Sequence, residues 1–371
     1  MSLSQQEAFA RIRLLRSPNI GPVSYRQLLA RFGSAAQAIK ALPELGSRGK
    51  TRYQPAPTAR IEQEIDGVRA AGARYLFHDQ PDYPELLSRL DSAPPIITCR
   101  GRLELASNPC VAMVGARSAS AASVKLARSF AAQLAQAGFT VVSGLARGID
   151  GAAHEGALNA NGGSTIGVIA SGIDIAYPPQ HTELQERIAE EGLLIAEQPP
   201  GTEPRGRHFP SRNRIIAGLA SGTLVVEAAP KSGSLITARL AAEAGREVMA
   251  IPGSPLDTRS HGCNQLIREG AILISDPADV IELLESFTGA PRSSYRVAED
   301  GEDYDPDMAS EVEPIAASVI EDMLSTAPIA VDELIRQSGA SGAAVQMALL
   351  ELELSGSIER HSAGQVSLSG G

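Results

Sequence analysis

The middle of the chain alternates short apolar runs with longer stretches that carry apolar residues at helical spacing. From residue 109 onward, each apolar run is followed by a glycine-rich turn and then by such a stretch. Continuously apolar strands that alternate with helices are typical of a parallel sheet covered on both faces. Residues 70–288 are therefore predicted to form an α/β domain. The apolar runs lie at 111–114, 139–142, 165–169, 193–195, 223–226 and 247–251.

The N-terminal segment, residues 1–65, has helical spacing and no strand pattern. Residues 19–22, Asn-Ile-Gly-Pro, separate two expected helices. A Gly-Pro turn of this kind can aim backbone N–H groups at a phosphate, as in helix-hairpin-helix modules, but a simple packing turn fits the pattern equally well. Residues 46–57, rich in Gly, Pro and basic residues, are predicted to be a linker.

The C-terminal segment, residues 314–371, combines helical spacing with a short hairpin pattern. Two extended pieces, at 357–360 and 365–368, follow the last expected helix. Helices followed by a small hairpin are typical of a winged helix. The expected second helix, 341–354, carries two glutamates and few cations, whereas a helix that reads DNA needs cations. This winged-helix-like domain is therefore predicted to pack against protein rather than to read DNA.

The formal net charge is −10, from 33 Lys and Arg against 43 Asp and Glu, which alone argues against a nucleic-acid partner. However, charges act only over a Debye length of about 8–10 Å, so their distribution matters more than their total. Residues 289–313 carry eight acidic side chains and two arginines and are predicted to be a disordered acidic linker. Because this segment supplies much of the net charge, the α/β domain can still present a cationic surface.

The cysteines and the hydropathy of the chain indicate the cellular compartment in which the protein works. Cys99, Cys110 and Cys263 are odd in number, far apart and without a CxxC pair, which argues against a disulfide framework or a zinc site. The polar N-terminus lacks the apolar core of a signal peptide, and no apolar run approaches the ~20 residues of a membrane span. We expect a cytoplasmic protein with no membrane association.

The loops at the expected carboxyl ends of the strands are rich in glycines, hydroxyl groups and cations. Ligands of open parallel sheets bind at this edge, and helix N-termini that begin there favour anions. Any one of these residues can be an ordinary surface residue, but their concentration at one edge indicates phosphate binding. The candidates are Gly115, Arg117, Ser143, Gly144, Arg147, Gly172, Arg212, Asn213, Arg214, Lys231, Gly233 and Ser234.

Two helices are predicted to begin beside these candidate phosphate-binding residues. Ser211 is predicted to be an N-cap, which places Arg212 and Arg214 in a first helical turn. The helix dipole disfavours cations there, so their presence suggests an anion partner. Asp150 is predicted to cap the next helix, and His154 to be hydrogen-bonded on a helix face.

Other site chemistries are not indicated. The GxGxxG dinucleotide fingerprint is absent, and no Ser/His/Asp or Cys/His set or metal-ligand spacing is evident. The strand-end acids, Asp150, Asp174 and Glu227, are spread over three loops. No catalytic residue, metal or cofactor is predicted.

Four segments together resemble the DprA/Smf family: residues 114–117, 143–150 with His154, 209–219 and 232–238. The resemblance spans the α/β domain in family order, and the flanking segments also resemble that family's helical and winged-helix domains. It implies an extended Rossmann-like parallel sheet that binds single-stranded DNA without catalysis, protects incoming DNA in natural transformation, forms a homodimer and helps to load RecA.

By matching motifs, the resemblance places DNA contacts on Arg117, Asn213 and Lys231, with Gly172 close to the DNA backbone. Two positions depart from the usual pattern. Ala116 replaces a small hydroxyl residue, which removes one possible phosphate donor, and His181 stands where Asn is more usual.

Two alternatives remain open. One is a nucleotide hydrolase related to the nucleoside-monophosphate phosphoribohydrolases, although their PGGxGTxxE signature is missing after Val226. The other is a scaffold for recombination proteins. DNA binding that survives deletion of both flanking domains would argue against the scaffold.

Overall fold

The computed structural model describes residues 3–45, 53–285, 315–361 and 364–369. The chain forms two compact units. One comprises Met1–Glu62 and Asp300–Gly371, and the other comprises Gln63–Glu299. The predicted acidic linker at 289–313 lies outside the described residues.

The central unit is built on a nine-stranded sheet in the order β1-β2-β6-β5-β4-β3-β7-β8-β9. The seven strands from β6 to β9 in that order are parallel, which confirms the predicted parallel sheet. Beyond β6 the sheet continues with β2, which is antiparallel to β6, and with β1, which is antiparallel to β2. The apolar pattern did not predict these two strands. The strands are β1 (Arg74–Phe77), β2 (Ile96–Gly101), β3 (Cys110–Val114), β4 (Thr140–Ser143), β5 (Thr165–Gly172), β6 (Leu193–Gln198), β7 (Gly222–Val225), β8 (Glu247–Ala250) and β9 (Ile272–Leu273).

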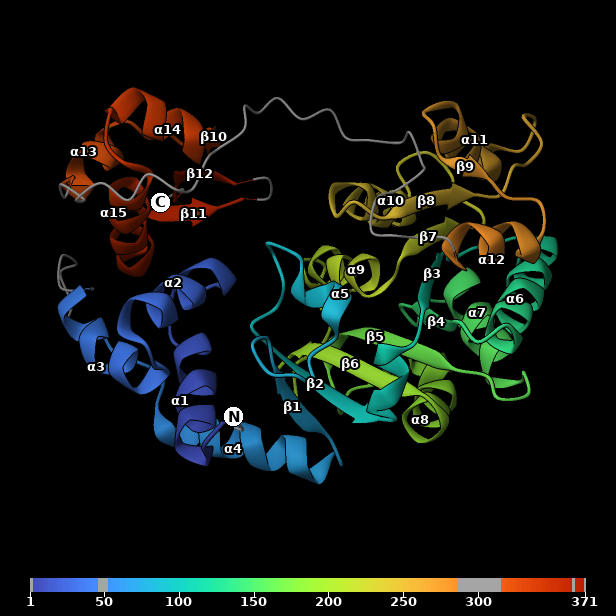
Figure 1. The fold of residues 1–371 in the computed structure, drawn as a ribbon, viewed down its shortest axis with the longest axis horizontal. Helices are drawn as coiled ribbons and strands as arrows, with labels where there is room; N and C mark the ends of the chain where they lie inside the picture. Colours follow the sequence, from blue (N-terminus) through green and yellow to red (C-terminus); the bar gives the residue numbers. More distant parts are fainter. Residues whose placement is uncertain (1–2, 46–52, 286–314, 362–363, 370–371) are drawn as a thin grey trace. The chain divides into compact units, whose positions relative to one another are not determined.

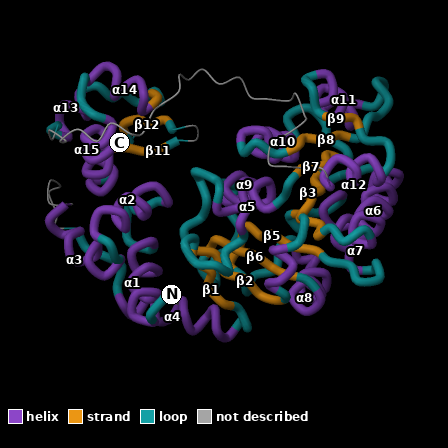
Figure 2. Tube along the Cα trace, in the orientation of Figure 1, coloured by secondary structure: helices purple, strands orange, loops and turns teal. Residues whose placement is uncertain are grey.

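Helices cover both faces of this sheet (Figures 1 and 2). Successive strand residues point to opposite faces, so Val111 and Met113 of β3 pack with α6, α7 and α12, whereas Ala112 and Val114 pack with α9, α10 and α11. The central parallel strands are mostly apolar on both faces because neither face meets water. The helices are α5 (Glu85–Ser88), α6 (Ala121–Gln136), α7 (Ile149–Leu158), α8 (Thr182–Glu191), α9 (His208–Leu219), α10 (Gly233–Glu243), α11 (His261–Arg268) and α12 (Pro277–Glu285).

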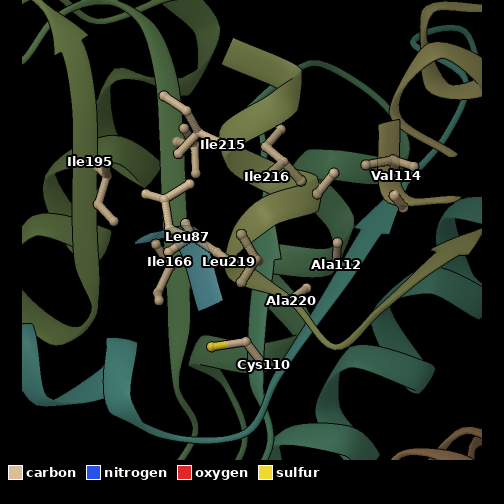
Figure 3. Close-up of a cluster of buried hydrophobic side chains, with 14 of the residues drawn as sticks. Leu87, Cys110, Ala112, Val114, Ile166, Ile195, Ile215, Ile216, Leu219 and Ala220 are labelled. Carbon is tan, nitrogen blue, oxygen red and sulfur yellow. The ribbon is translucent and has the colours of Figure 1, made fainter. Parts of the chain in front are cut away.

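Helix α9 is central to one face. Figure 3 shows Ile215, Ile216 and Leu219 gathered with Leu87 of α5 and Ile166 of β5 in one apolar cluster. A Cβ atom at Gly218 would lie 2.9 Å from a methyl group of Leu87, so glycine allows α9 to approach α5 closely. This packing fixes the position of α9, whose N-terminal turns carry Phe209, Arg212 and Asn213.

The other unit contains two groups of helices. The first is α1 (Gln5–Leu15), α2 (Pro22–Phe32), α3 (Ala35–Leu45) and the start of α4 (Thr58–Ala70). The second is a winged helix made of α13 (Ala317–Asp322), α14 (Val331–Ser338) and α15 (Gly342–Ser355) with β10 (Ile329–Ala330), β11 (Ile358–Arg360) and β12 (Gln365–Leu368), in the sheet order β10-β12-β11.

Helix α15 of the winged helix packs against the N-terminal helices. Leu350 and Leu354 are buried in one cluster with Leu28 of α2. Beside them, the Ser24 hydroxyl donates a hydrogen bond to Glu353 over 2.6 Å, and the Arg360 Nε donates to the same carboxylate over 2.9 Å. These contacts agree with the prediction that the winged helix is a packing module.

None of the described helices combines the length and the apolar character that a membrane span requires.

The core of the central unit gives a first prediction. Ile216→Ala on α9 should lower the free energy of unfolding of the central unit by about 2–5 kcal/mol, because it leaves a cavity in a close-packed cluster. Ile236→Ala on α10, where the side chain is 45% exposed, is the matched control and should cost about 0.5 kcal/mol or less. Native-state hydrogen exchange of the β3 and β5 amides measures both. Equal losses would contradict this description of the core.

Candidate nucleic-acid interface

The loops that follow parallel strands β3, β4, β5 and β7 meet at one edge of the sheet, together with the N-terminal turns of α9. A small pocket opens there, between the glycine-rich loops and α9. Its lining residues are Arg117, Gly144, Ala146, Arg147, Ala170, Tyr177, Pro178, Phe209 and Arg212. Three of these four loops, those after β3, β4 and β5, thus line a single pocket together with α9, and the loop after β7 is not part of its lining.

Cations and aromatic rings lie together at this pocket. The Arg117 guanidinium carbon is 5.1 Å from the centroid of the Phe209 ring, within the range of a cation–π contact. The Phe209 and Tyr177 rings are 5.7 Å apart, and Tyr177 is 41% exposed. The side chains of Arg117 and Arg147 are exposed, and neither forms an ion pair with a described residue.

The Arg212 side chain is buried beneath the edge of the sheet and is not exposed on its surface. It is 6% exposed and donates hydrogen bonds to the carbonyl of Gly144 and, over 2.6 Å, to that of Val168. Burial lowers the pKa of Arg212 to about 10, while the attraction of Asp150 opposes this shift. A Cβ atom at Gly144 would collide with the guanidinium, so this glycine is required by Arg212. Arg212 therefore supports the β4 and β5 ends and is not available to a phosphate.

Asp150 binds backbone amides of the same loop. Its carboxylate accepts a hydrogen bond from the Gly144 N–H over 3.1 Å and another from the Ala146 N–H. Burial raises the pKa of Asp150, and Arg212 together with the amides opposes that rise. The carboxylate thus occupies the backbone N–H of Gly144, one of the predicted phosphate-binding residues.

The other two strand-end acids act in the same way. Asp174 accepts from the Gly201 N–H at 2.8 and 3.0 Å. Glu227 accepts from the Ser120 N–H at 3.1 Å. Each carboxylate thus occupies a backbone N–H group that a phosphate could otherwise contact.

The loop after β7 presents Lys231 to solvent. Lys231 has φ of +65°, a left-handed conformation that is uncommon for a residue with a side chain, and it is exposed. The Asn213 Nδ2 donates to the Gly233 carbonyl over 3.4 Å, and its Oδ1 accepts from the Nε of Arg212 over 3.2 Å. Asn213 thus links the buried arginine to the loop that carries Lys231. Gly233 itself is exposed, with open space where a Cβ atom would lie.

Five other candidates are engaged or closely packed within the protein. Arg214 pairs with Glu197 and donates to the Ser92 carbonyl. The Ser143 hydroxyl donates to the Met113 carbonyl over 2.6 Å, and the buried Ser234 hydroxyl lies 2.8 Å from that of Ser232. Gly172 and Gly115 are closely packed, because a Cβ atom at either would approach neighbouring atoms within 3.0 Å.

Both predicted helix caps were wrong. Helix α9 begins at His208 with Arg207 as its N-cap, so Ser211 and Arg212 lie one turn inside the helix and the dipole argument does not apply to them. Helix α7 begins at Ile149 with Gly148 as its N-cap, so Asp150 lies in the first turn.

The candidates predicted from the sequence omit four residues that the structure places at or beside this edge. Tyr177 and Phe209 line the pocket. Arg205 and Arg207, immediately before α9, are exposed. The available signal was the position of rare aromatic residues, 4% of the chain, next to glycines and arginines.

Within the described residues, no group of three or more His, Cys, Asp or Glu side chains is arranged to hold a metal ion.

Comparisons with known proteins point to one family. The family described as DNA recombination-mediator protein A matches residues 74–285. A DprA-like N-terminal HHH domain matches residues 5–67, and a DprA winged helix domain matches residues 305–364.

Individual relatives cover most of the chain. Protein Smf of Synechocystis is 34% identical over 92% of this chain and 94% of its own length. The crystal structure of DNA processing protein A from Streptococcus pneumoniae covers 76% of this chain and 98% of its own, with a TM-score of 0.63 and 35% identity. DNA processing protein A from Helicobacter pylori, solved in a study of its single-stranded DNA binding mode, covers 58% of this chain and 99% of its own, with a TM-score of 0.52 and 30% identity.

Buried His154 gives a prediction on pH. It is fully buried, lies 2.7 Å from the Thr165 hydroxyl, and burial lowers its pKa from 6.5 to about 3, with smaller contributions from His181 and Arg212. The unfolded chain therefore binds a proton below pH 6.5 that the folded chain does not bind until about pH 3. Stability from this residue is present above pH 6.5 and falls by up to about 1.4 kcal/mol per pH unit as pH drops through that window.

Replacing His154 with Gln removes the titrating group and should flatten this part of the pH profile. Urea unfolding followed by circular dichroism between pH 4 and 7 measures the slope for both proteins. An unchanged slope in the variant would show that other groups cause the pH dependence.

Proposed function

The chain belongs to the DNA recombination-mediator protein A (DprA/Smf) family, whose members are DNA-processing proteins of transformation and recombination, and on this premise we propose that it binds single-stranded DNA along the carboxyl edge of its central sheet. Exposed Arg117, Arg147 and Lys231 contact successive phosphates. Arg212 and Asn213 support the loops from within. The observation that carries the proposal is the pair of exposed arginines at one pocket, Arg117 and Arg147, with exposed Lys231 in the loop after β7. The acids of these loops already accept hydrogen bonds from backbone amides.

The proposed surface suits single strands of any sequence. Cations bind phosphates without reading base edges, and the faces of Tyr177 and Phe209 can stack on a base of any type. The winged helix adds no obvious duplex reader, because Leu350 and Leu354 of α15 are buried against the N-terminal helices. Preference for single strands over duplex is therefore part of the proposal.

The proposal also covers the oligomeric state, the protein partner and the cellular location. We assign a homodimer to the central unit, where Leu273 on edge strand β9 is 48% exposed and Leu256 is 93% exposed. In such a dimer, one DNA strand would contact the proposed binding edge of each protomer. Light scattering of Leu273→Glu beside the wild-type protein tests this, since an unchanged mass would exclude β9 as the interface. Help in loading RecA and a cytoplasmic location complete the proposal and rest on family membership.

Substitution of the exposed cations tests the DNA surface. Arg117→Ala and Lys231→Ala should each weaken binding of labelled oligo-dT and lower the slope of log affinity against log salt by about 0.7, the value for one phosphate contact on a single strand. Fluorescence anisotropy at several salt concentrations measures affinity and slope.

The control is Arg239→Ala, an exposed arginine on α10 that pairs with Glu243 over 2.8 Å and should leave both quantities as in the wild type. Unchanged affinity in both Arg117→Ala and Lys231→Ala would remove the basis of the proposed surface.

A further prediction is that the protein binds DNA without cleaving it and without hydrolysing nucleotides. Asp150, Asp174 and Glu227 are held by backbone amides of three separate loops, whereas metal-dependent hydrolysis of phosphodiesters needs carboxylates grouped on the ions. Incubation with single-stranded DNA and with nucleoside monophosphates, with and without Mg²⁺ or Mn²⁺, should give neither shorter strands nor free base. Product that disappears in Glu227→Ala or Asp174→Ala would favour a hydrolase instead.

A further inference from the structure

Glu227 holds the loop that carries Arg117 at both of its ends. It lies two residues after the end of β7 and is 4% exposed. Its backbone carbonyl accepts a hydrogen bond from the Ala116 N–H over 2.7 Å, immediately before Arg117. Its carboxylate accepts from the N–H of Ser120 at 3.1 Å and from the hydroxyl of Ser120 at 2.8 Å, immediately after the loop.

The far end of the loop is fixed further through helix α6. Ser120 is the N-cap of α6, and its hydroxyl oxygen accepts from the Ser123 N–H over 3.1 Å. The Ser123 hydroxyl donates to the Glu227 carboxylate over 2.8 Å. Ser120, Ser123 and the Glu227 carboxylate thus join the start of α6 to the chain just after β7. These bonds leave few alternative arrangements for the chain between Ala116 and Ser120.

Close packing leaves this short loop little other freedom. A Cβ atom at Gly115 would lie 3.0 Å from the Glu227 carbonyl and 2.6 Å from a side-chain atom of Ile149. Arg117 is nevertheless exposed, with its guanidinium over the Phe209 ring. The backbone of Arg117 is held while its side chain faces the pocket.

We propose that Glu227 is a positioning residue for DNA binding, acting through Arg117. This inference rests on the proposed function and assigns a role to an acid that the phosphate surface itself does not use. Glu227 orients the Arg117 backbone, so that the guanidinium meets a phosphate without first ordering the loop. Pre-ordered groups bind more tightly because less conformational entropy is lost.

The sign of the effect separates this role from simple electrostatics. A carboxylate close to a phosphate-binding surface repels the DNA, so if Glu227 acted only as a charge, its removal would strengthen binding. If it positions Arg117, its removal weakens binding. Glu227→Ala removes both the charge and the hydrogen-bond acceptor, whereas Glu227→Gln removes the charge and keeps an acceptor oxygen for the Ser120 N–H.

The experiment measures oligo-dT affinity and salt slope for the full chain with Glu227→Ala, Glu227→Gln, Arg117→Ala and the double variant Arg117→Ala/Glu227→Ala. Glu227→Ala should weaken binding about tenfold, as loss of one charge-assisted contact does, and lower the salt slope by about 0.7. Glu227→Gln should bind at least as tightly as the wild type. The double variant should bind no more weakly than Arg117→Ala, since the lost residue acts through the other.

Asp174→Ala controls for general damage to the edge. Asp174 holds the Gly201 N–H in a different loop, so its effect should add to that of Arg117→Ala. Additive losses for Glu227→Ala and Arg117→Ala, or tighter binding by Glu227→Ala, would overturn the positioning role alone. Failure of the wild-type protein to bind oligo-dT would instead overturn the proposed function.

Discussion

The arginine buried beneath the carboxyl edge is the element on which the rest of the site depends. Arg212 donates to the Gly144 carbonyl just after β4 and to the Val168 carbonyl within β5, and it attracts Asp150. It also binds Asn213, which in turn donates to the loop of Lys231. A buried guanidinium is costly unless its donors are satisfied, so this network tolerates few alternative loop positions. α9 carries both Arg212 and Asn213, and its apolar face anchors the network in the core.

The acidic side chains at this edge likewise bond groups of the protein itself. In many phosphate sites, backbone amides at helix N-termini contact the anion. Here Asp150, Asp174 and Glu227 already bind amides of the strand-end loops, which makes the loops rigid in the free protein. In the proposed mode of binding, recognition is left to Arg117, Arg147 and Lys231, whose flexible side chains suit a row of phosphates better than a single nucleotide. This division of roles also explains why acids close to a DNA surface need not weaken it.

Sequence patterns predicted most of the fold for a simple reason. Strands β3 to β8 are buried on both faces, so their apolar runs are continuous and each is followed by a helix period. The antiparallel edge strand β1 was missed because it is short and begins with the exposed Arg74 and half-buried Tyr75. The start of α9 was misplaced because the Phe209-Pro210 pair was taken to precede the helix, whereas a proline in the first turn costs no hydrogen bond.

The site was harder to predict because its chemistry depends on contacts across the sheet. Arg117 and Arg212 have the same residue type and similar surroundings in sequence, yet one is exposed and the other is buried between carbonyls of two strands. The partners of Asp150 and Glu227 are likewise set by tertiary packing. Spacing located the loops correctly, but only the structure shows which of their side chains face outward.

The occupation of loop amides by carboxylates is tested most directly by hydrogen exchange at single residues. The amides of Ser120, Gly144 and Gly201 are measured in the free protein and with saturating oligo-dT. The account predicts that all three are already protected in the free protein and gain little protection on binding, because Glu227, Asp150 and Asp174 hold them throughout. Rapid exchange in the free protein, replaced by strong protection once DNA is bound, would contradict it and would show that backbone amides hold the phosphates.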